Sequence, residues 1–406
     1  MKNLRWLALS WLVVLIPGIY SQTEEPGGRI TALDISGLKR TKLHVAERPL
    51  RQFLGIDAAD IDIDAVYAVL MDTGILEPLN VDIRDTGDGR GKILMVEVRE
   101  KWSVFPLPVV FVGSGGTSFG GFFVDTNAFG LNDKFFIGGM YGSAGWMTLG
   151  VYVHTPVREG FPGWTMSGSF ARSEQRHTDQ RDEDLRRFDL DRISGSAGLT
   201  YTFTEVFKGA VDLSYTQALL QETDGGERHI GIAAELALRK ARWDGFLLSE
   251  ESLSGSYKVM AGLDSPFFQV LRFRGVYEKS LLPGFRVRLH TGALYAPGVT
   301  VLSESSPSVA QVAILPQSFS ARHYAGASLG LEKYLFKMAW GVLSGGVSYQ
   351  GVYSYGSILG NQFDHGLAGT LSFYLSKLAI PALGIGIAYN VYADYLQGSF
   401  SLGVSF

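Results

Sequence analysis

The chain has 406 residues, with 36 Lys and Arg against 40 Asp and Glu and a formal net charge of −4. This balance leaves no strongly basic surface, so nucleic acid is excluded as a partner. The absence of cysteine excludes disulfides, thiolate metal sites, thiol catalysis and lipidation at an N-terminal Cys. Aromatic residues make up 12% of the chain and there are 50 glycines, both high for a soluble enzyme.

The first 21 residues have the pattern of an export signal. Lys2 and Arg5 precede an apolar run from Trp6 to Ile19, and Ser21 is a small residue suited to a cleavage site. The run is short for a spanning helix, which needs about 20 residues. We expect a cleaved signal in preference to a retained anchor, so the mature chain leaves the cytoplasm.

Residues 28–100 are predicted to form a small α+β domain. The expected strands are 30–37, 79–84 and 93–98, and the expected helices are 45–54 and 61–73. Asp60 or Asp62 is placed to cap the second helix, and Gly74 is placed to end it.

From Trp102 onward the pattern alternates with period two, as in β-strands that separate lipid from water. Ile232 and Leu236, for example, would share one face, and Glu235 would lie on the other. A charge facing lipid near the midplane costs about 2–4 kcal/mol, so the charged face must point inward.

About sixteen such segments follow one another, and an even number closes an antiparallel barrel. Long polar connections at 172–187, 221–228, 297–323 and 353–364 alternate with mostly shorter ones, although 154–163 and 239–250 are long for turns. The predicted fold is therefore an all-β transmembrane barrel over 102–406, preceded by the α+β domain. A soluble β-sandwich is the alternative, but it gives no reason for an apolar face on every strand.

The final segment suits the wall of such a barrel and also its closure. Phe400, Leu402, Val404 and Phe406 share one face, and the other face carries serine and glycine. This strand must close against the first one. Two prolines, Pro106 and Pro108, cannot donate to the ladder there, and Gly398 and Gly403 weaken the closing strand. The sequence predicts a weak seam that opens as a lateral gate, with strain relief at the strand start as the alternative.

Signals of catalysis are missing from the sequence. Residues 87–92 are glycine-rich but lack the spacing and the Ser or Thr of a phosphate-binding loop, so a hairpin turn is expected. The histidines are scattered without metal-ligand spacing, and no nucleophile elbow joins a strand to a helix. We expect neither an enzyme nor a cofactor.

Several segments resemble the outer-membrane assembly family that includes BamA and TamA, also called the bacterial surface antigen family. Ile35-Ser-Gly37, Val69–Leu76 and Leu94–Glu100 are similar to a polypeptide-transport-associated (POTRA) domain. In the barrel, Phe123–Gly130 is similar to the family's second-strand motif ending in Asn-x-Phe-Gly. The motif residues here are Asp125, Asn127, Phe129 and Gly130.

The resemblance also implies an infolded lumen loop. Ser318–Tyr324 lies where the family has an Arg-Gly-aromatic motif, which makes Arg322 and Tyr324 the equivalent residues, although His323 replaces the glycine. The thirteenth strand of the family usually carries an Asp that pairs with this Arg. Tyr349 or Gln350 stands there in this chain, so a neutral hydrogen bond would replace the ion pair. A solvated loop arginine is the other interpretation of Arg322.

Arg272, Arg274, Arg286 and Arg288 alternate along two neighbouring segments and are predicted to form a basic stripe in the lumen. The stripe would hold the infolded loop or attract an acidic client. It is equally consistent with ordinary wetted lumen surface.

The function implied by the resemblance is insertion or translocation of polypeptides at the bacterial outer membrane, with the POTRA domain in the periplasm. The implied partners are the lipid bilayer with lipopolysaccharide, unfolded outer-membrane or secreted polypeptides, and periplasmic or lipoprotein accessory subunits. A passive diffusion channel and a dedicated two-partner secretion pore are the alternatives.

Overall fold

The computed structural model describes residues 28–87, 91–154, 156, 160–204, 206–223, 225–244, 247–307, 312–338, 341–375 and 381–402. The predicted export signal at 1–21 lies outside these residues, as do Val404 and two of the predicted seam residues, Gly403 and Phe406.

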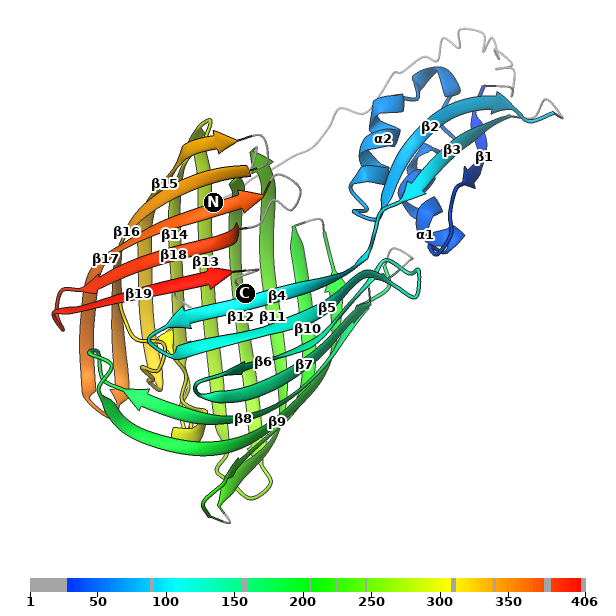
Figure 1. The fold of residues 1–406 in the computed structure, drawn as a ribbon. Coiled ribbons are helices and arrows are strands. Elements are labelled where there is room, and N and C mark those ends of the chain that lie inside the picture. Colours follow the sequence, from blue (N-terminus) through cyan, green and yellow to red (C-terminus); the bar gives the residue numbers. More distant parts are fainter. Residues whose placement is uncertain are drawn as a thin grey trace, which may run out of the picture.

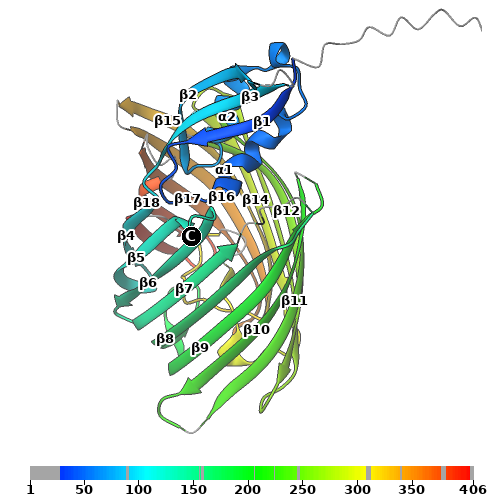
Figure 2. The same cartoon turned by 90° about the vertical axis from the view of Figure 1, so that its right-hand side faces the viewer.

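The small N-terminal domain is a three-stranded sheet in the order β1-β3-β2, with its helices on one face (Figures 1 and 2). The strands are β1 (Ile30–Ser36), β2 (Leu76–Asp85) and β3 (Lys92–Glu100). Leu94, Val96 and Val98 alternate along β3 and are buried against Leu50 and Leu70 from the helical side. The predicted α+β domain is confirmed. Because β3 is central, β1 and β2 are both edge strands.

The helices of this domain follow the predicted order with one correction. The segment expected as a single helix over 45–54 is a short α-helix, α1 (Leu43–Glu47), followed by a 3₁₀ helix, η1 (Arg48–Phe53). Pro49 explains the change, because proline lacks the N–H that would continue the α-helical ladder. A second 3₁₀ turn, η2 (Ala58–Asp60), precedes the second α-helix.

That helix, α2 (Ile63–Met71), begins and ends as its sequence predicts. Asp62 caps it by accepting a hydrogen bond from the backbone N–H of Asp64 at 2.9 Å. Gly74 follows with a φ of 74°, a left-handed conformation that favours glycine.

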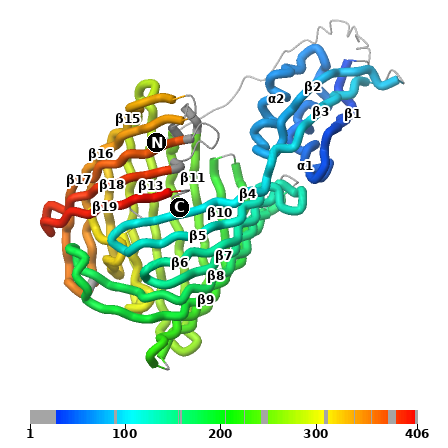
Figure 3. Tube along the Cα trace, in the orientation of Figure 1, coloured from blue at the N-terminus to red at the C-terminus, as the bar shows by residue number. Residues whose placement is uncertain are grey.

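Within the described ranges, sixteen strands form a closed antiparallel barrel (Figures 1 and 3). They are β4 (Val104–Gly113), β5 (Gly116–Ala128), β6 (Asp133–Gly142), β7 (Gly145–His154), β8 (Gly163–Thr178), β9 (Asp184–Thr202), β10 (Phe207–Leu220), β11 (Gly226–Asp244), β12 (Leu247–Gly262), β13 (Phe268–Leu282), β14 (Phe285–Tyr295), β15 (His323–Met338), β16 (Gly341–Ser357), β17 (Gly360–Leu375), β18 (Pro381–Asn390) and β19 (Tyr395–Leu402). The predicted barrel is confirmed.

The outer wall is apolar, as the alternation predicts. Ile232 and Leu236 are 56% and 57% exposed on β11, and Leu329 and Ile387 are similarly exposed on β15 and β18. No helix in the described part of the chain is long and apolar enough to cross a membrane.

Two connections expected as loops are mostly strand. The 172–187 segment extends β8 and β9 and leaves a turn at 179–183, and the 353–364 segment extends β16 and β17 in the same way. Cross-strand ion pairs account for the first of these extensions, because Arg172 and Asp191 meet at 2.7 Å across the ladder. The 239–250 connection is likewise mostly strand, because β11 continues to Asp244 and β12 begins at Leu247.

Candidate functional site

The barrel closes through a short ladder between β19 and β4, which lie side by side in Figure 3. In the described part of the chain this seam has three residue pairs, Phe400 with Val112, Ser401 with Phe111 and Leu402 with Val110. On the other side of β19, the ladder to β18 has eight pairs. β19 is described as far as Leu402, so these three pairs are the described part of the seam ladder.

The predicted seam residues lie on the two closing strands. Pro106 and Pro108 lie on β4 outside the three seam pairs, opposite Phe123 and Gly121 of β5. Gly398 lies on β19 opposite Ile387 of β18. Proline removes a backbone donor from this part of β4. The predicted weakness of the seam at these residues stays a prediction.

The connection between β14 and β15 folds into the barrel lumen instead of standing out in solvent. Its residues Ile314, Phe319 and Ala321 are at most 1% exposed and belong to one hydrophobic cluster with the inner wall. The wall contributes Met260, Phe268, Leu294, Tyr324, Val352, Ala368 and Ala388. Burying a side chain such as Ile or Phe stabilises by about 1.5–3 kcal/mol, so this cluster holds the loop as a plug.

The plug touches both sides of the seam from inside. Gln397 of β19 donates from its side-chain amide to the carbonyl oxygens of Ala313 and Leu315, the latter at 2.9 Å. The backbone N–H of Gln317 donates to Ser114 Oγ in the β4–β5 turn at 3.0 Å. Residues 313–317 therefore bridge the two strands that close the barrel.

A cavity of about 280 Å³ lies between the plug and the wall beside the seam. Small and polar side chains line much of it, among them Ser114, Ser306, Gln317, Thr370, Gln397 and Ser399. Val312, Leu315 and Ile387 also line it, so the lining is mixed.

Arg322 pairs within the plug. Its Nε donates to Glu304 Oε1 at 3.1 Å, and the Glu304 side chain is 4% exposed whereas that of Arg322 is 45% exposed. His177 Nδ1 of β8 lies 3.6 Å from the other carboxylate oxygen. The arginine thus joins two ends of the same loop, and in this structure its partner is not on the thirteenth strand.

The thirteenth strand, β16, holds the plug through Gln350. Its Oε1 accepts a hydrogen bond from the backbone N–H of Ala313 at 2.6 Å. Tyr349 points to the outside, 53% exposed, with its hydroxyl 3.0 Å from His365 Nδ1. Tyr324 is buried in the lumen cluster. Of the two residues proposed for the position of the family's Asp, Gln350 is the one that contacts the loop, and it does so through Ala313.

The second-strand motif lies at the junction between the barrel and the small domain. Arg40, in the β1–α1 loop, donates to Asp125 Oδ2 at 2.5 Å and to Ser103 Oγ at 3.1 Å. Asn127 donates from its amide to Thr41 Oγ1 at 2.9 Å. These contacts fasten one loop of the small domain to the end of β5.

The turn that ends this motif also contacts the small domain. The carbonyl of Gly130 accepts from Lys42 N at 2.9 Å, and a Cβ at Gly130 would stand 2.1 Å from the Arg40 carbonyl oxygen. With a φ of 74°, this position requires glycine for both conformation and space. Phe129 is 70% exposed and points away from the junction, with its ring centroid 6.0 Å from that of Tyr152.

Glu100, the last residue of β3, fixes the same loop and was not singled out from the sequence. Its Oε1 accepts from the backbone N–H groups of Lys39, Arg40 and Thr41 at 3.0, 2.9 and 2.6 Å. Burial acts to raise the pKa of Glu100, but these N–H donors outweigh it and hold the pKa below its ordinary value. The ionised carboxylate is therefore part of the junction.

The predicted basic stripe divides into two parts. Arg286 meets Glu278 at 2.6 Å and Glu332 at 2.7 Å, and Arg288 contacts the same two carboxylates. Arg272 and Arg274 stay exposed on β13, and the described residues give them no ion pair. Only these two present free positive charge, because the β14 arginines are neutralised by Glu278 and Glu332.

Within the described residues, no cluster of three or more His, Asp or Glu is arranged to hold a metal ion. The buried carboxylates Glu278 and Glu332 pair instead with Arg286 and Arg288.

The fold was compared with known proteins. No protein-family model and no curated protein sequence matches the chain. Among solved structures, BamA from Haemophilus ducreyi lacking POTRA domains 1–3 matches with a TM-score of 0.63 at 12% identity, covering 93% of this chain and 84% of that one. CdiB from Acinetobacter baumannii matches with a TM-score of 0.64 at 12% identity, covering 94% and 74%. CdiB from Escherichia coli gives 0.62 at 12%, covering 93% and 76%.

At these identities the likeness concerns the fold. The chain has the fold of BamA and CdiB, which confirms the predicted resemblance at the level of the fold. The correspondence of the second-strand motif and the lumen-loop residues stays a prediction.

Proposed function

We propose that this protein inserts or translocates polypeptides at the bacterial outer membrane, with a client strand pairing at the β4–β19 seam. The observation that carries the proposal is that β4 and β19 close the barrel and that the lumen loop bridges them through Gln397 and Ser114. The fold shared with BamA and CdiB supports the same class of function. No catalytic chemistry is required, since folding and lipid burial of the client supply the driving force.

A client is captured through its main chain. When the seam opens, β4 and β19 each present unpaired N–H and C=O groups, and an extended segment adds to such an edge as a further strand. Backbone hydrogen bonds give affinity without requiring one client sequence. The seam-side cavity leaves room on the lumen side for this exchange.

The plug controls opening in this proposal. Gln397 and Ser114 hold residues 313–317 across the seam, so separating the strands means breaking these hydrogen bonds or moving the plug. The buried cluster around Phe319 resists such movement. A passive diffusion channel has no use for this arrangement, and the plug therefore favours the translocation proposal.

The small domain is proposed to be a periplasmic POTRA domain that receives the client. The match to BamA covers 93% of the chain, more than the barrel occupies, so it extends into this domain. The edge strand β2 is available for strand addition, and the Arg40–Asp125 junction sets its direction relative to the barrel.

A seam disulfide tests the proposal. Ser401→Cys with Phe111→Cys places cysteines on directly paired residues of β19 and β4 in a chain that has no other cysteine. The matched control joins Ser401→Cys to Gly384→Cys, its partner on β18. The assay follows folding of a urea-denatured eight-stranded barrel protein into liposomes that contain each variant. Oxidation should abolish the acceleration in the seam variant alone, and reduction should restore it. Undiminished folding with the seam locked would refute the gate.

A further inference from the structure

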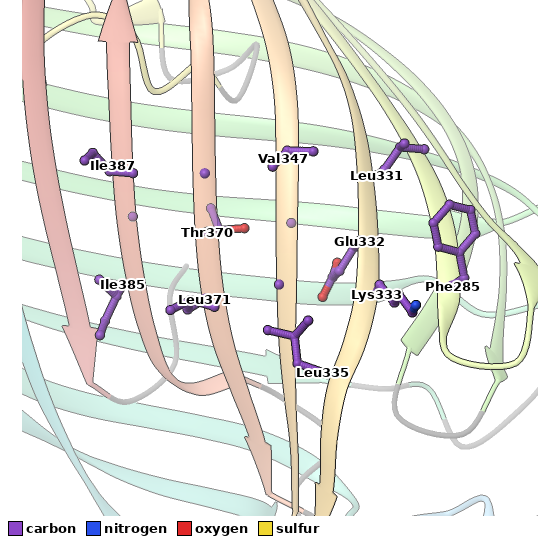
Figure 4. Close-up of a pocket in the computed structure, with 14 residues that line it drawn as sticks. Phe285, Leu331, Glu332, Lys333, Leu335, Val347, Thr370, Leu371, Ile385 and Ile387 are labelled. Atoms are coloured by element: carbon purple, nitrogen blue, oxygen red, sulfur yellow. The ribbon is translucent and has the colours of Figure 1, made fainter.

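The outer wall of the barrel carries a hollow at β15–β18, on the outer face of the wall that borders the seam-side cavity from within. The cavity measures about 580 Å³, within the range of small-molecule sites, and its exposed lining is almost wholly apolar. Figure 4 shows Phe285 and Lys333 on one side and Ile385 and Ile387 on the other.

The strand register explains why a hollow forms there. One outward row across the four strands reads Leu331, Val347, Gly369 and Ile387, and the next reads Lys333, Gly345, Leu371 and Ile385. Each row lacks one side chain, at β17 in the first row and at β16 in the second. The two glycines are diagonal neighbours. The space over Gly369 is open, whereas the Leu335 side chain lies over Gly345, with its Cδ1 2.9 Å from the position of a Cβ there. Leu335 and the other branched side chains form the walls of the depression.

The hollow lies toward the small-domain end of the barrel and has a cation at its edge. Lys333 stands five residues before Met338, where β15 ends on the small-domain side of the barrel (Figure 1). The Lys333 side chain is exposed on the outer face, and it has no ion pair among the described residues. A lysine in this position extends its ammonium group to the membrane surface while its stem covers apolar wall.

We propose that this hollow, formed around Gly345 and Gly369, binds one acyl chain of a glycerophospholipid whose anionic phosphate pairs with Lys333. Branched side chains on both flanks give the hydrocarbon lateral contacts that a flat barrel wall does not offer. The charge of Lys333 selects an anionic headgroup in the leaflet on the small-domain side.

This inference rests on the membrane placement given under the proposed function but not on client insertion. Its test is therefore a binding experiment on the purified full chain, which distinguishes its failure from failure of the gate.

Two substitutions remove separate parts of the site. Gly369→Leu places a side chain in the open part of the hollow. A Cβ at this position would lie 3.5 Å from Ile387 Cγ2, which is an ordinary van der Waals contact, so the backbone accommodates the substitution. Lys333→Gln removes the charge. The matched controls are Gly255→Leu, at an outward glycine of β12 whose Cβ would have no neighbour closer than 4.0 Å, and Lys240→Gln on β11.

Each variant is mixed in mild detergent with phosphatidylglycerol, and retained lipid is counted by native mass spectrometry after heat-modifiable migration has verified the folded barrel. Wild type and both controls should retain one lipid at concentrations where Gly369→Leu retains none. Lys333→Gln should bind about fivefold more weakly, the loss expected for one surface cation. Three results would overturn the proposal. Either site variant could retain as much lipid as wild type, Gly255→Leu could lose as much lipid as Gly369→Leu, or the wild-type protein could prefer lipopolysaccharide to phosphatidylglycerol.

Discussion

The structure allows the free-energy contribution of the Arg40–Asp125 ion pair at the domain junction to be predicted. Asp125→Asn keeps the shape of the side chain but removes its charge, leaving Arg40 without the partner it now meets at 2.5 Å. The Asp125 side chain is 8% exposed, but that of Arg40 is 42% exposed. A charge-assisted hydrogen bond contributes about 1.5–3 kcal/mol, and the exposure of Arg40 places the expected loss near the lower end, at about 2 kcal/mol.

A loss of about 2 kcal/mol raises the opening equilibrium of the junction by roughly thirtyfold. Hydrogen exchange measured by mass spectrometry should show faster exchange in peptides covering 39–42 and 125–132, with unchanged exchange in β2. Asp82→Asn is the control, because its ion pair with Arg84 is exposed on both sides and surface pairs of that kind contribute little. If Asp125→Asn exchanged like wild type, the Arg40–Asp125 pair would not be what holds the domains together.

Two further predictions concern the junction and the plug. The lowered pKa of Glu100 means that its stabilisation of Lys39–Thr41 is present above the pKa of the unfolded chain and is lost as pH falls through the lowered folded value. The protection factors of the 39–41 amides, which are corrected for the pH dependence of intrinsic exchange, should therefore fall on acidification in wild type, and in Glu100→Gln they should be low already at neutral pH. Arg322→Ala leaves the buried Glu304 without its 3.1 Å partner and should raise plug mobility and single-channel conductance in planar bilayers, with the outward-facing Tyr349→Phe as control. Conductance equal to wild type would remove the special role of Arg322.

Much of the fold was predictable because period-two alternation marks a wall between lipid and water. That signal ends where strands leave the membrane. Segments 172–187 and 353–364 carry polar residues on both faces, so they were expected as loops although they continue the ladders. Pro49 was readable as a helix breaker, but the 45–54 segment was still expected as one helix.

The candidate site was less predictable, because its contacts join residues far apart in the sequence. Arg40 and Asp125 are separated by 85 positions, and Gln397 reaches a loop 82 positions earlier. Neither pair of residues produces a motif among neighbouring residues that the sequence alone would show. The partners of Arg286 were readable in principle, since Glu278 and Glu332 occupy inward positions on the two neighbouring strands. The second-strand motif was found by resemblance, and its place at the domain junction required the structure.

Direct capture of a client on β4 tests the central claim most directly. A single cysteine at Phe111, whose seam partner is Ser401, is combined with a single cysteine in the final strand of a denatured outer-membrane barrel substrate. A mixed disulfide should form during assembly with Phe111→Cys and should be missing with Thr216→Cys, which lies within the continuous β9–β10–β11 wall. Equal adduct formation at both positions, or none at Phe111 while the substrate folds, would contradict strand pairing at the seam.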